Sequence, residues 1–323
     1  MQEAMIKRAL ELLESGEVNR VLGWRRGEFS YDVTPAIFTD ANQLQNDFVY
    51  DVFCGANLSK YLVKETVKEG KILVFLKPCD TYSFNQLLSE HRIVREKIYA
   101  IGIACDGMVD IDRIRTAGVS GVKSIRSEDN ELVADTIYGE RRIAKENALA
   151  IRCLDCKSHK HVAYDELIGD DGEVLESKRF DMVAKLENMT AEDRYAFWRN
   201  ELSKCIRCNA CRNVCPACTC EKCVFDNADS GVENKAAANS FEENLFHIIR
   251  AFHVAGRCTD CGECSRVCPS GIPLHLLNRK FIKDINELYG EYQAGETVNE
   301  RGPLVNYTFD DVEPSVVHER GNR

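Results

Sequence analysis

Long apolar runs are missing from this sequence. No stretch reaches the roughly 18 to 20 uninterrupted apolar residues that a membrane-spanning helix needs, so we expect no direct membrane span. The N-terminal segment carries Glu3, Lys7, Arg8 and Glu11 and lacks the apolar core of a secretory signal peptide. These absences predict a soluble globular protein, and the expected location is the cytoplasm.

A surplus of basic residues is also missing. The 42 Lys and Arg are outnumbered by 52 Asp and Glu, which gives a net charge of -10. Because a nucleic-acid-binding surface needs a basic face, no nucleic-acid partner is expected. The acidity favours solubility, or a redox partner that presents basic patches.

The signatures of several enzyme classes are absent. No nucleophile triad, phosphate-binding loop or pair of general acids is legible, and no G-x-G-x-x-G follows a predicted strand. No catalytic residue is therefore assigned. The length of 323 residues, with 44% hydrophobic content, suits about two domains with ordinary cores.

Cysteine, by contrast, is abundant, with 16 in the chain. Half of them form two C-x2-C-x2-C-x3-C-P runs, which are Cys205, Cys208, Cys211 and Cys215 with Pro216, and Cys258, Cys261, Cys264 and Cys268 with Pro269. In such ferredoxin runs three cysteines hold one 4Fe-4S cluster and the fourth ligates the other. We therefore predict crossed ligand sets, Cys205, Cys208, Cys211 and Cys268 for one cluster and Cys258, Cys261, Cys264 and Cys215 for the other.

Zinc and disulfide bonds are the structural alternatives for these eight cysteines. Structural zinc prefers two C-x2-C pairs with a long spacer and has no use for a third and fourth cysteine before a proline. Disulfide bonds belong to oxidising compartments, which the missing signal peptide argues against. Iron–sulfur ligation is the better interpretation.

The remaining eight cysteines would fill two more four-ligand sites. They are Cys54, Cys79, Cys105, Cys153, Cys156, Cys218, Cys220 and Cys223. The count does not choose their pairing, and any lone member can instead be a small buried hydrophobe.

Two of these cysteines follow predicted buried strands in an N-terminal α/β pattern. Residues 71–76 and 98–104 are nearly continuous apolar runs, and they lead into Cys79 and Cys105. Since ligands of α/β sheets lie at the carboxyl ends of strands, both cysteines are expected at the same edge. The knuckle Cys153-x2-Cys156 is a third element for that site, with a redox dithiol as its alternative.

Two smaller expectations concern residues near these motifs. His159 and His161, after the knuckle, are expected to face solvent. The C-x-C-x2-C trio of Cys218, Cys220 and Cys223 lacks a fourth ligand, which Cys54 would supply. A zinc site or a structural loop remains the alternative for the trio.

The chain divides into four predicted parts. Residues 1–165 form an α/β domain with a 4Fe-4S site, 166–197 a linker and helix, and 198–290 an α-helical dicluster ferredoxin domain. Thr190 is expected to cap the helix that leads to the first run. The polar tail 291–323 would be disordered, draped over the protein or bound to a partner through Val305, Tyr307, Phe309 and Val312.

The residues also resemble a known family. Lys77-Pro78-Cys79, Ile101-Gly102-Ile103-Ala104-Cys105 and the Cys153-x2-Cys156 knuckle resemble, in order and context, the cysteine positions of beta subunits of deazaflavin-reducing hydrogenases and formate dehydrogenases. That resemblance implies a domain with a 4Fe-4S cluster and, in many members, FAD. Residues 198–289 resemble the helical two-cluster ferredoxin module of heterodisulfide reductase and succinate dehydrogenase iron–sulfur subunits.

Three functions follow as hypotheses. The first is a non-catalytic electron-transfer subunit, which joins a dehydrogenase or hydrogenase subunit to a flavin-containing or heterodisulfide-reductase-like partner through its 4Fe-4S clusters. The second is a flavin-containing subunit that exchanges hydride with deazaflavin or NAD(P)H, although no flavin-binding motif is located. The third is a zinc or cluster scaffold without a redox role.

Overall fold

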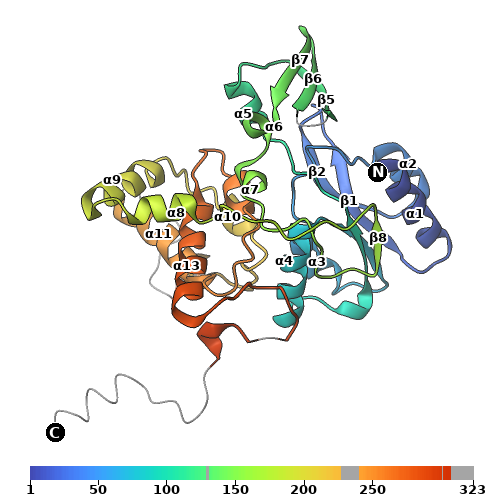
Figure 1. The fold of residues 1–323 in the computed structure, drawn as a ribbon. Helices are drawn as coiled ribbons and strands as arrows, with labels where there is room; N and C mark the ends of the chain where they lie inside the picture. Colours follow the sequence, from blue (N-terminus) through green and yellow to red (C-terminus); the bar gives the residue numbers. More distant parts are fainter. Residues whose placement is uncertain (129–130, 227–239, 300, 307–323) are drawn as a thin grey trace.

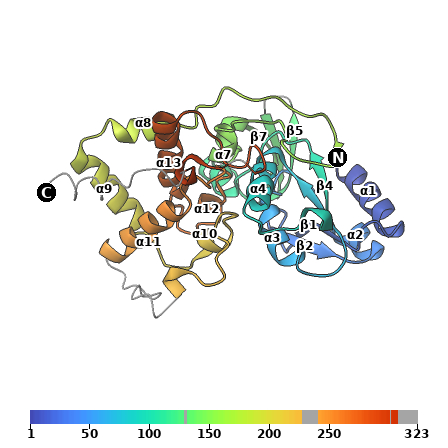
Figure 2. The same ribbon diagram turned by 90° about the horizontal axis from the view of Figure 1, so that it is seen from below.

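The computed structural model describes residues 1–306 except 129–130, 227–239 and 300. An α/β region built on residues 1–168 lies beside a region of helices from residue 181 onward (Figure 1). Figure 2 shows the same arrangement from below, with the short helices of the cysteine runs close to the junction of the two regions. The expected fold class, α/β followed by mainly helical, is confirmed.

A five-stranded sheet organises the α/β region. Its strands are, in spatial order, β2 (Val33–Phe38), β1 (Arg20–Arg26), β3 (Ile72–Leu76), β4 (Ile98–Ile103) and β8 (Glu166–Ile168). β1, β3, β4 and β8 run parallel, and β2 is an antiparallel edge strand. The predicted strands 71–76 and 98–104 are β3 and β4, and all five residues of β3 are buried, as expected for a parallel strand covered on both faces.

Helices cover both faces of this sheet. They are α1 (Gln2–Glu14), α2 (Ala41–Asp47), α3 (Ser59–Glu65) and α4 (Pro78–Ser89). α1 and α2 lie on the side away from the helical region, and α3 and α4 lie on the side toward it (Figures 1 and 2). α4 follows β3 directly, which brings the start of this helix to the carboxyl edge of the sheet.

A second, antiparallel sheet was not expected from the sequence. β5 (Val122–Glu128), β6 (Glu131–Thr136) and β7 (Gly139–Ala144) form it in that order after the short helix α5 (Ile111–Thr116). Most residues of β5 and β7 are exposed or half-buried, so these strands carry no apolar run of the kind that marks β3. The sheet packs only a small core, which includes Ile114, Leu132 and Ile143.

The sheet extends past the boundary predicted at residue 165. β8 pairs in parallel with β4, and Arg8 of α1 holds Glu166 of β8 at 2.9 Å. The chain then crosses to the helical region through residues 169–180.

The helical region holds both cysteine runs. Its helices are α8 (Asp181–Glu187), α9 (Ala191–Leu202), α10 (Ala210–Asn213), α11 (Ser240–His253), α12 (Glu263–Arg266) and α13 (Leu274–Tyr289). Thr190 caps α9 as predicted, because its side chain accepts a hydrogen bond from the Asp193 N–H at 3.1 Å. Leu202, Phe246 and Ile272 form the core together with two buried cysteines, Cys211 and Cys264.

The first part of the tail lies against the α/β region. The Asn299 N–H donates to Ser89 Oγ of α4 at 3.2 Å, and a Cβ at Gly295 would fall 1.9 Å from the Tyr82 carbonyl oxygen. Val305 is exposed, whereas Tyr307, Phe309 and Val312 lie outside the described residues. In the part of the chain that the structure describes, no helix has the length and apolar character needed to cross a membrane.

Candidate metal centres

The two cysteine runs share one backbone conformation. Arg207 and Asn209 flank the second cysteine of the first run with φ of 55° and 61°, and Asp260 and Gly262 flank it in the second run with φ of 58° and 67°. These left-handed positions are uncommon for residues other than glycine. Their recurrence at equivalent places in both runs indicates two loops shaped for the same task.

Backbone N–H groups in both loops point at cysteine sulfurs. The Arg207 N–H donates to Cys205 Sγ at 3.4 Å, and the Asp260 N–H makes the equivalent bond to Cys258. Asn278 of α13 also donates to Cys264 Sγ, at 3.7 Å. Such N–H donors stabilise sulfur that carries negative charge, as the thiolates on an iron–sulfur cluster do.

The structure brings the runs together in a crossed manner. Cys205, Cys208 and Cys211 line one cavity, and the fourth cysteine there is Cys268 from the other run. Cys215, the last cysteine of the first run, is an electrostatic neighbour of Cys258, Cys261 and Cys264. The geometry therefore places the thiols in the two groups predicted from the sequence.

A polar side chain beside the first cavity has no partner. His247 of α11 is 1% exposed, lines this cavity, and has neither ring nitrogen hydrogen-bonded in the described structure. An orphaned buried polar group is costly unless a group that is not protein completes it. Cluster sulfide or a ligating thiolate would provide that acceptor.

The thiols do not converge as they would around a single ion. In the described residues, no three His, Cys, Asp or Glu side chains come close enough to share one metal. A zinc ion would draw its sulfurs to about 2.3 Å from a common centre. A cubane cluster instead lies between four separated sulfurs.

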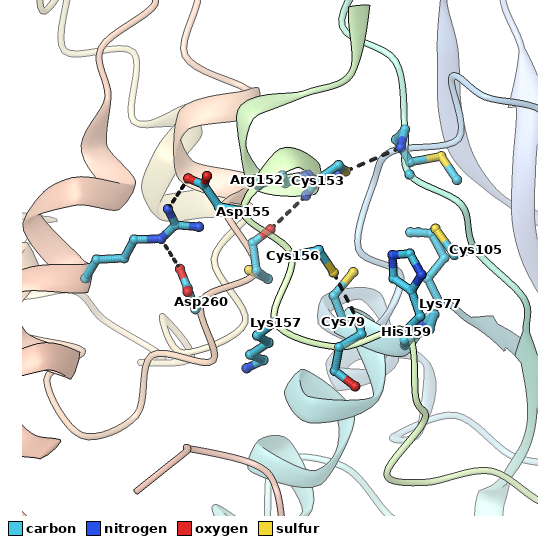
Figure 3. A pocket seen from close by; sticks show the side chains of 16 residues that line it. Lys77, Cys79, Cys105, Arg152, Cys153, Asp155, Cys156, Lys157, His159 and Asp260 are labelled. Carbon is cyan, nitrogen blue, oxygen red and sulfur yellow. Dashed lines mark hydrogen bonds and ion pairs between the residues drawn. The ribbon is translucent and has the colours of Figure 1, made fainter. Parts of the chain in front are cut away.

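A third cysteine group lies at the carboxyl edge of the large sheet. Cys79 in the first turn of α4, Cys105 after β4, and Cys153 and Cys156 of the knuckle line one cavity (Figure 3). Cys153 belongs to the short helix α7 (Ile151–Leu154), and its sulfur accepts the Met108 N–H at 3.3 Å. Burial raises the pKa of Cys79 well above its ordinary value and that of Cys105 to about 12.

This third cavity adjoins the second cysteine run. Cys261 lines the cavity together with the four cysteines of the sheet edge. Arg152 lies between the two groups, where it donates to the Cys261 carbonyl at 2.8 Å and pairs with Glu263 at 2.5 Å. Gly262 allows this approach, because a Cβ there would lie 2.8 Å from the Arg152 Cβ.

Further buried charges surround the third cavity. Lys77 pairs with Asp80 at 2.8 Å, and both side chains are 1% exposed. On the side of the helical region, Arg279 bridges Asp260 at 2.8 Å and Asp155 at 2.7 Å. Sequence reasoning missed these ion pairs, because the partners of Arg279 lie far away along the chain and charged side chains are ordinarily expected at the surface.

The prediction that His159 and His161 face solvent is wrong for His161. That side chain is 4% exposed, with Nδ1 at 2.7 Å from Asp171 and Nε2 at 3.2 Å from the carbonyls of Leu76 and Ile103. It therefore fastens the loop after the knuckle to the ends of β3 and β4. His159 is half-buried and lines the third cavity.

The other four cysteines do not share a site. Cys54 is fully buried in the α/β core, where its thiol lies 3.6 Å from the Val49 carbonyl, and burial raises its pKa to about 12. Cys218 is hydrogen-bonded to Cys215, Cys220 is exposed, and Cys223 contacts Arg212. Cys218 and Cys220 line the same cleft between the two regions, whereas Cys223 and Cys54 do not line it.

Sequence comparison decides the nature of the two-run region. Residues 201–272 match a family described as a 4Fe-4S dicluster domain. This region is a 4Fe-4S dicluster domain. The cofactor prediction of 4Fe-4S clusters is confirmed, and it agrees with the crossed cavity, the N–H donors and the orphaned histidine described above.

Most of the chain is also similar to characterised beta subunits. The F420-dependent formate dehydrogenase subunit beta of Methanocaldococcus jannaschii is 23% identical over 337 residues, covering 86% of this chain and 88% of the relative. The F420-dependent formate dehydrogenase 1 subunit beta of Methanococcus maripaludis is 25% identical, covering 68% and 73%. A chain in the F420-reducing [NiFe] hydrogenase complex of Methanosarcina barkeri matches with a TM-score of 0.42 and 14% identity, over 58% of this chain and 76% of that one. The resemblance predicted from the cysteine motifs is confirmed.

Proposed function

We propose that this chain is an iron–sulfur electron-transfer subunit of a formate dehydrogenase or F420-reducing hydrogenase type of complex. The observation that carries the proposal is the succession of three cysteine-lined sites, in which Cys261 belongs to the second run and also borders the sheet-edge cavity. Bound 4Fe-4S clusters supply one-electron transfer, and closely spaced clusters are what a relay requires.

In this proposal twelve cysteines hold three clusters. The ligand sets are Cys205, Cys208, Cys211 and Cys268; Cys258, Cys261, Cys264 and Cys215; and Cys79, Cys105, Cys153 and Cys156. The chain's own part is to fix these sulfurs, donate N–H groups to them and keep water away from them. The remaining cysteines are not assigned to a cluster, since Cys218 and Cys220 line a separate cleft and Cys54 lies in the apolar core.

The proposal also covers the partner subunits and the location of the complex. The partners would be a catalytic dehydrogenase or hydrogenase subunit and a flavin-containing or heterodisulfide-reductase-like subunit, and the complex would work in the cytoplasm. The beta subunits from M. jannaschii and M. maripaludis support the first kind of partner.

Metal and sulfide analysis of the anaerobically purified chain tests the proposal. We expect about 12 iron atoms and as many sulfides per chain, with negligible zinc, because each of three cubanes holds four of each. A preparation that contains zinc in place of iron, or no inorganic sulfide, would contradict it.

A cleft between the two regions favours one alternative, a flavin-containing subunit. The cleft is about 840 Å³ and has apolar walls that include Leu22 and Ile37 of the sheet, with Lys60, Lys64 and Arg92 among its cations. This size and the mixture of apolar wall and cationic groups suit a nucleotide cofactor with phosphates. Bound flavin would enable hydride exchange with deazaflavin or NAD(P)H.

Flavin absorbance in an acid extract separates the two functions. If the chain purified from its native host releases about one flavin per polypeptide, the alternative is supported. An extract without flavin, from protein that holds its full iron, leaves the electron-transfer role alone.

A further inference from the structure

Arg250 is buried between the two cysteine groups of the dicluster domain. It belongs to α11, is 4% exposed, and its Nη2 donates to the carbonyl of Cys211 at 3.3 Å. Its guanidinium also hydrogen-bonds the side chain of Cys264. Cys211 belongs to the first ligand set and Cys264 to the second, so this one side chain contacts both.

No carboxylate neutralises this cation in the described part of the chain. Arg250 forms no ion pair there, and its Nε has no hydrogen-bond partner. The groups that raise its pKa most are all sulfurs, namely Cys264, Cys215, Cys211 and Cys218. A buried charge without a counter-charge is strongly unfavourable, so the negative charge that balances Arg250 must come from ligated sulfur.

The arginine at the next junction is different. Arg152, between the second ligand set and the sheet-edge cysteines, is paired with Glu263 at 2.5 Å. Arg266 pairs with the same carboxylate at 2.7 Å, so Glu263 partly balances both guanidinium groups. Arg250 differs from Arg152 in having no carboxylate partner among the described residues.

We propose that Arg250 is a positioning residue that raises the reduction potentials of both clusters of the dicluster domain relative to the sheet-edge cluster. Adding an electron makes a cluster more negative, and a nearby cation in a low-dielectric interior stabilises that reduced form. The hydrogen bond to Cys264 acts in the same direction. This inference rests on the proposed function, because it requires clusters at these sites.

Redox titration of the full-length, anaerobically purified chain, monitored by electron paramagnetic resonance, tests the effect of Arg250 on the cluster potentials. In Arg250→Gln we expect both dicluster potentials to become more negative, with the sheet-edge signal and the iron content unchanged. Arg250→Lys keeps the charge and should restore potentials close to those of the parent protein.

Arg212→Gln is the matched control. Arg212 also lies in the first run, but Asp226 already neutralises it at 2.7 Å, so we expect no shift. Unchanged potentials in an iron-replete Arg250→Gln protein would overturn the inference. If that variant loses iron, Arg250→Lys decides alone, because a shifted potential in that charge-preserving variant contradicts the electrostatic role and an unshifted one supports it. Absence of iron from the parent protein would instead defeat the proposed function.

Discussion

At the residue scale, cysteine spacing carried most of what the sequence could say about the site. The crossed grouping of the two runs follows from a fixed local pattern, and the structure places Cys268 and Cys215 in opposite groups accordingly. The burial of Arg250 and Arg152 was not predicted, because the sequence alone does not distinguish a buried arginine from an exposed one. Only the fold reveals that their partners are cysteine loops far along the chain.

A pair of substitutions distinguishes ligating from structural cysteines at this scale. Cys105→Ala should remove about four iron atoms and one spectroscopic component, because Cys105 lines the sheet-edge cavity. Cys54→Ala should keep all the iron, since the thiol lies in the apolar core. Iron counting and electron paramagnetic resonance measure both. Full iron in Cys105→Ala would remove the third cluster from the proposal.

Cys218 allows a second prediction for a single residue. Its thiol is hydrogen-bonded to Cys215, and the Cys218 N–H also donates to the Cys215 carbonyl at 3.1 Å. Two sulfurs in such close contact cannot occupy separate irons of one cube, so Cys218 is available when Cys215 is lost. We expect Cys215→Ala to retain most of its iron.

The matched double variant tests this replacement. Cys215→Ala with Cys218→Ala should lose about four iron atoms, whereas Cys218→Ala alone should lose none. Equal iron loss in the single Cys215→Ala and double variants, measured by elemental analysis, would show that Cys218 does not substitute.

At the element scale, the two strands predicted for the large sheet are buried, and two of the strands that were missed are largely exposed. Continuous apolar runs in the sequence predicted β3 and β4. β5 and β7 do not, because much of each strand is exposed and charged. β8 has only three residues and depends on pairing with β4, so no local pattern could place it in the sheet.

The contact of α7 with α12 yields a stability prediction. Arg152 and Glu263 form an ion pair between these helices, with side chains 9% and 0% exposed. Arg152→Met should lower the free energy of unfolding by less than the roughly 3–5 kcal/mol of a fully uncompensated buried charge, because Arg266 still pairs with Glu263. Denaturant titration of the iron-replete protein measures this loss.

The double variant Arg152→Met with Glu263→Gln provides the control. It removes the carboxylate charge that Arg266 alone would have to balance, so we expect it to recover part of the lost stability. If the two variants are equally unstable, lost packing rather than the ion pair explains the effect.

At the scale of the whole molecule, the two regions differ in the size of their apolar cores. The sheet and its helices share a large apolar core, whereas the core of the dicluster region is small and includes Cys211 and Cys264. The sequence predicted both regions but not the way they join, since Arg257 with Glu90 and Lys157 with the Thr259 carbonyl are contacts between distant segments. The contacts between the two regions could therefore be identified only in the three-dimensional structure.

Iron removal should destabilise the dicluster region more than the sheet region. Because metal binding supplies folding free energy where the apolar core is small, chelation should unfold α10 to α13 first and leave β1, β3 and β4 folded. Hydrogen exchange of the full chain before and after anaerobic chelation measures this, with fast exchange expected in α12 and retained protection in β3. Equal loss of protection in both would show that the sheet also relies on its metal, and that Cys79 and Cys105 fasten it through their cluster.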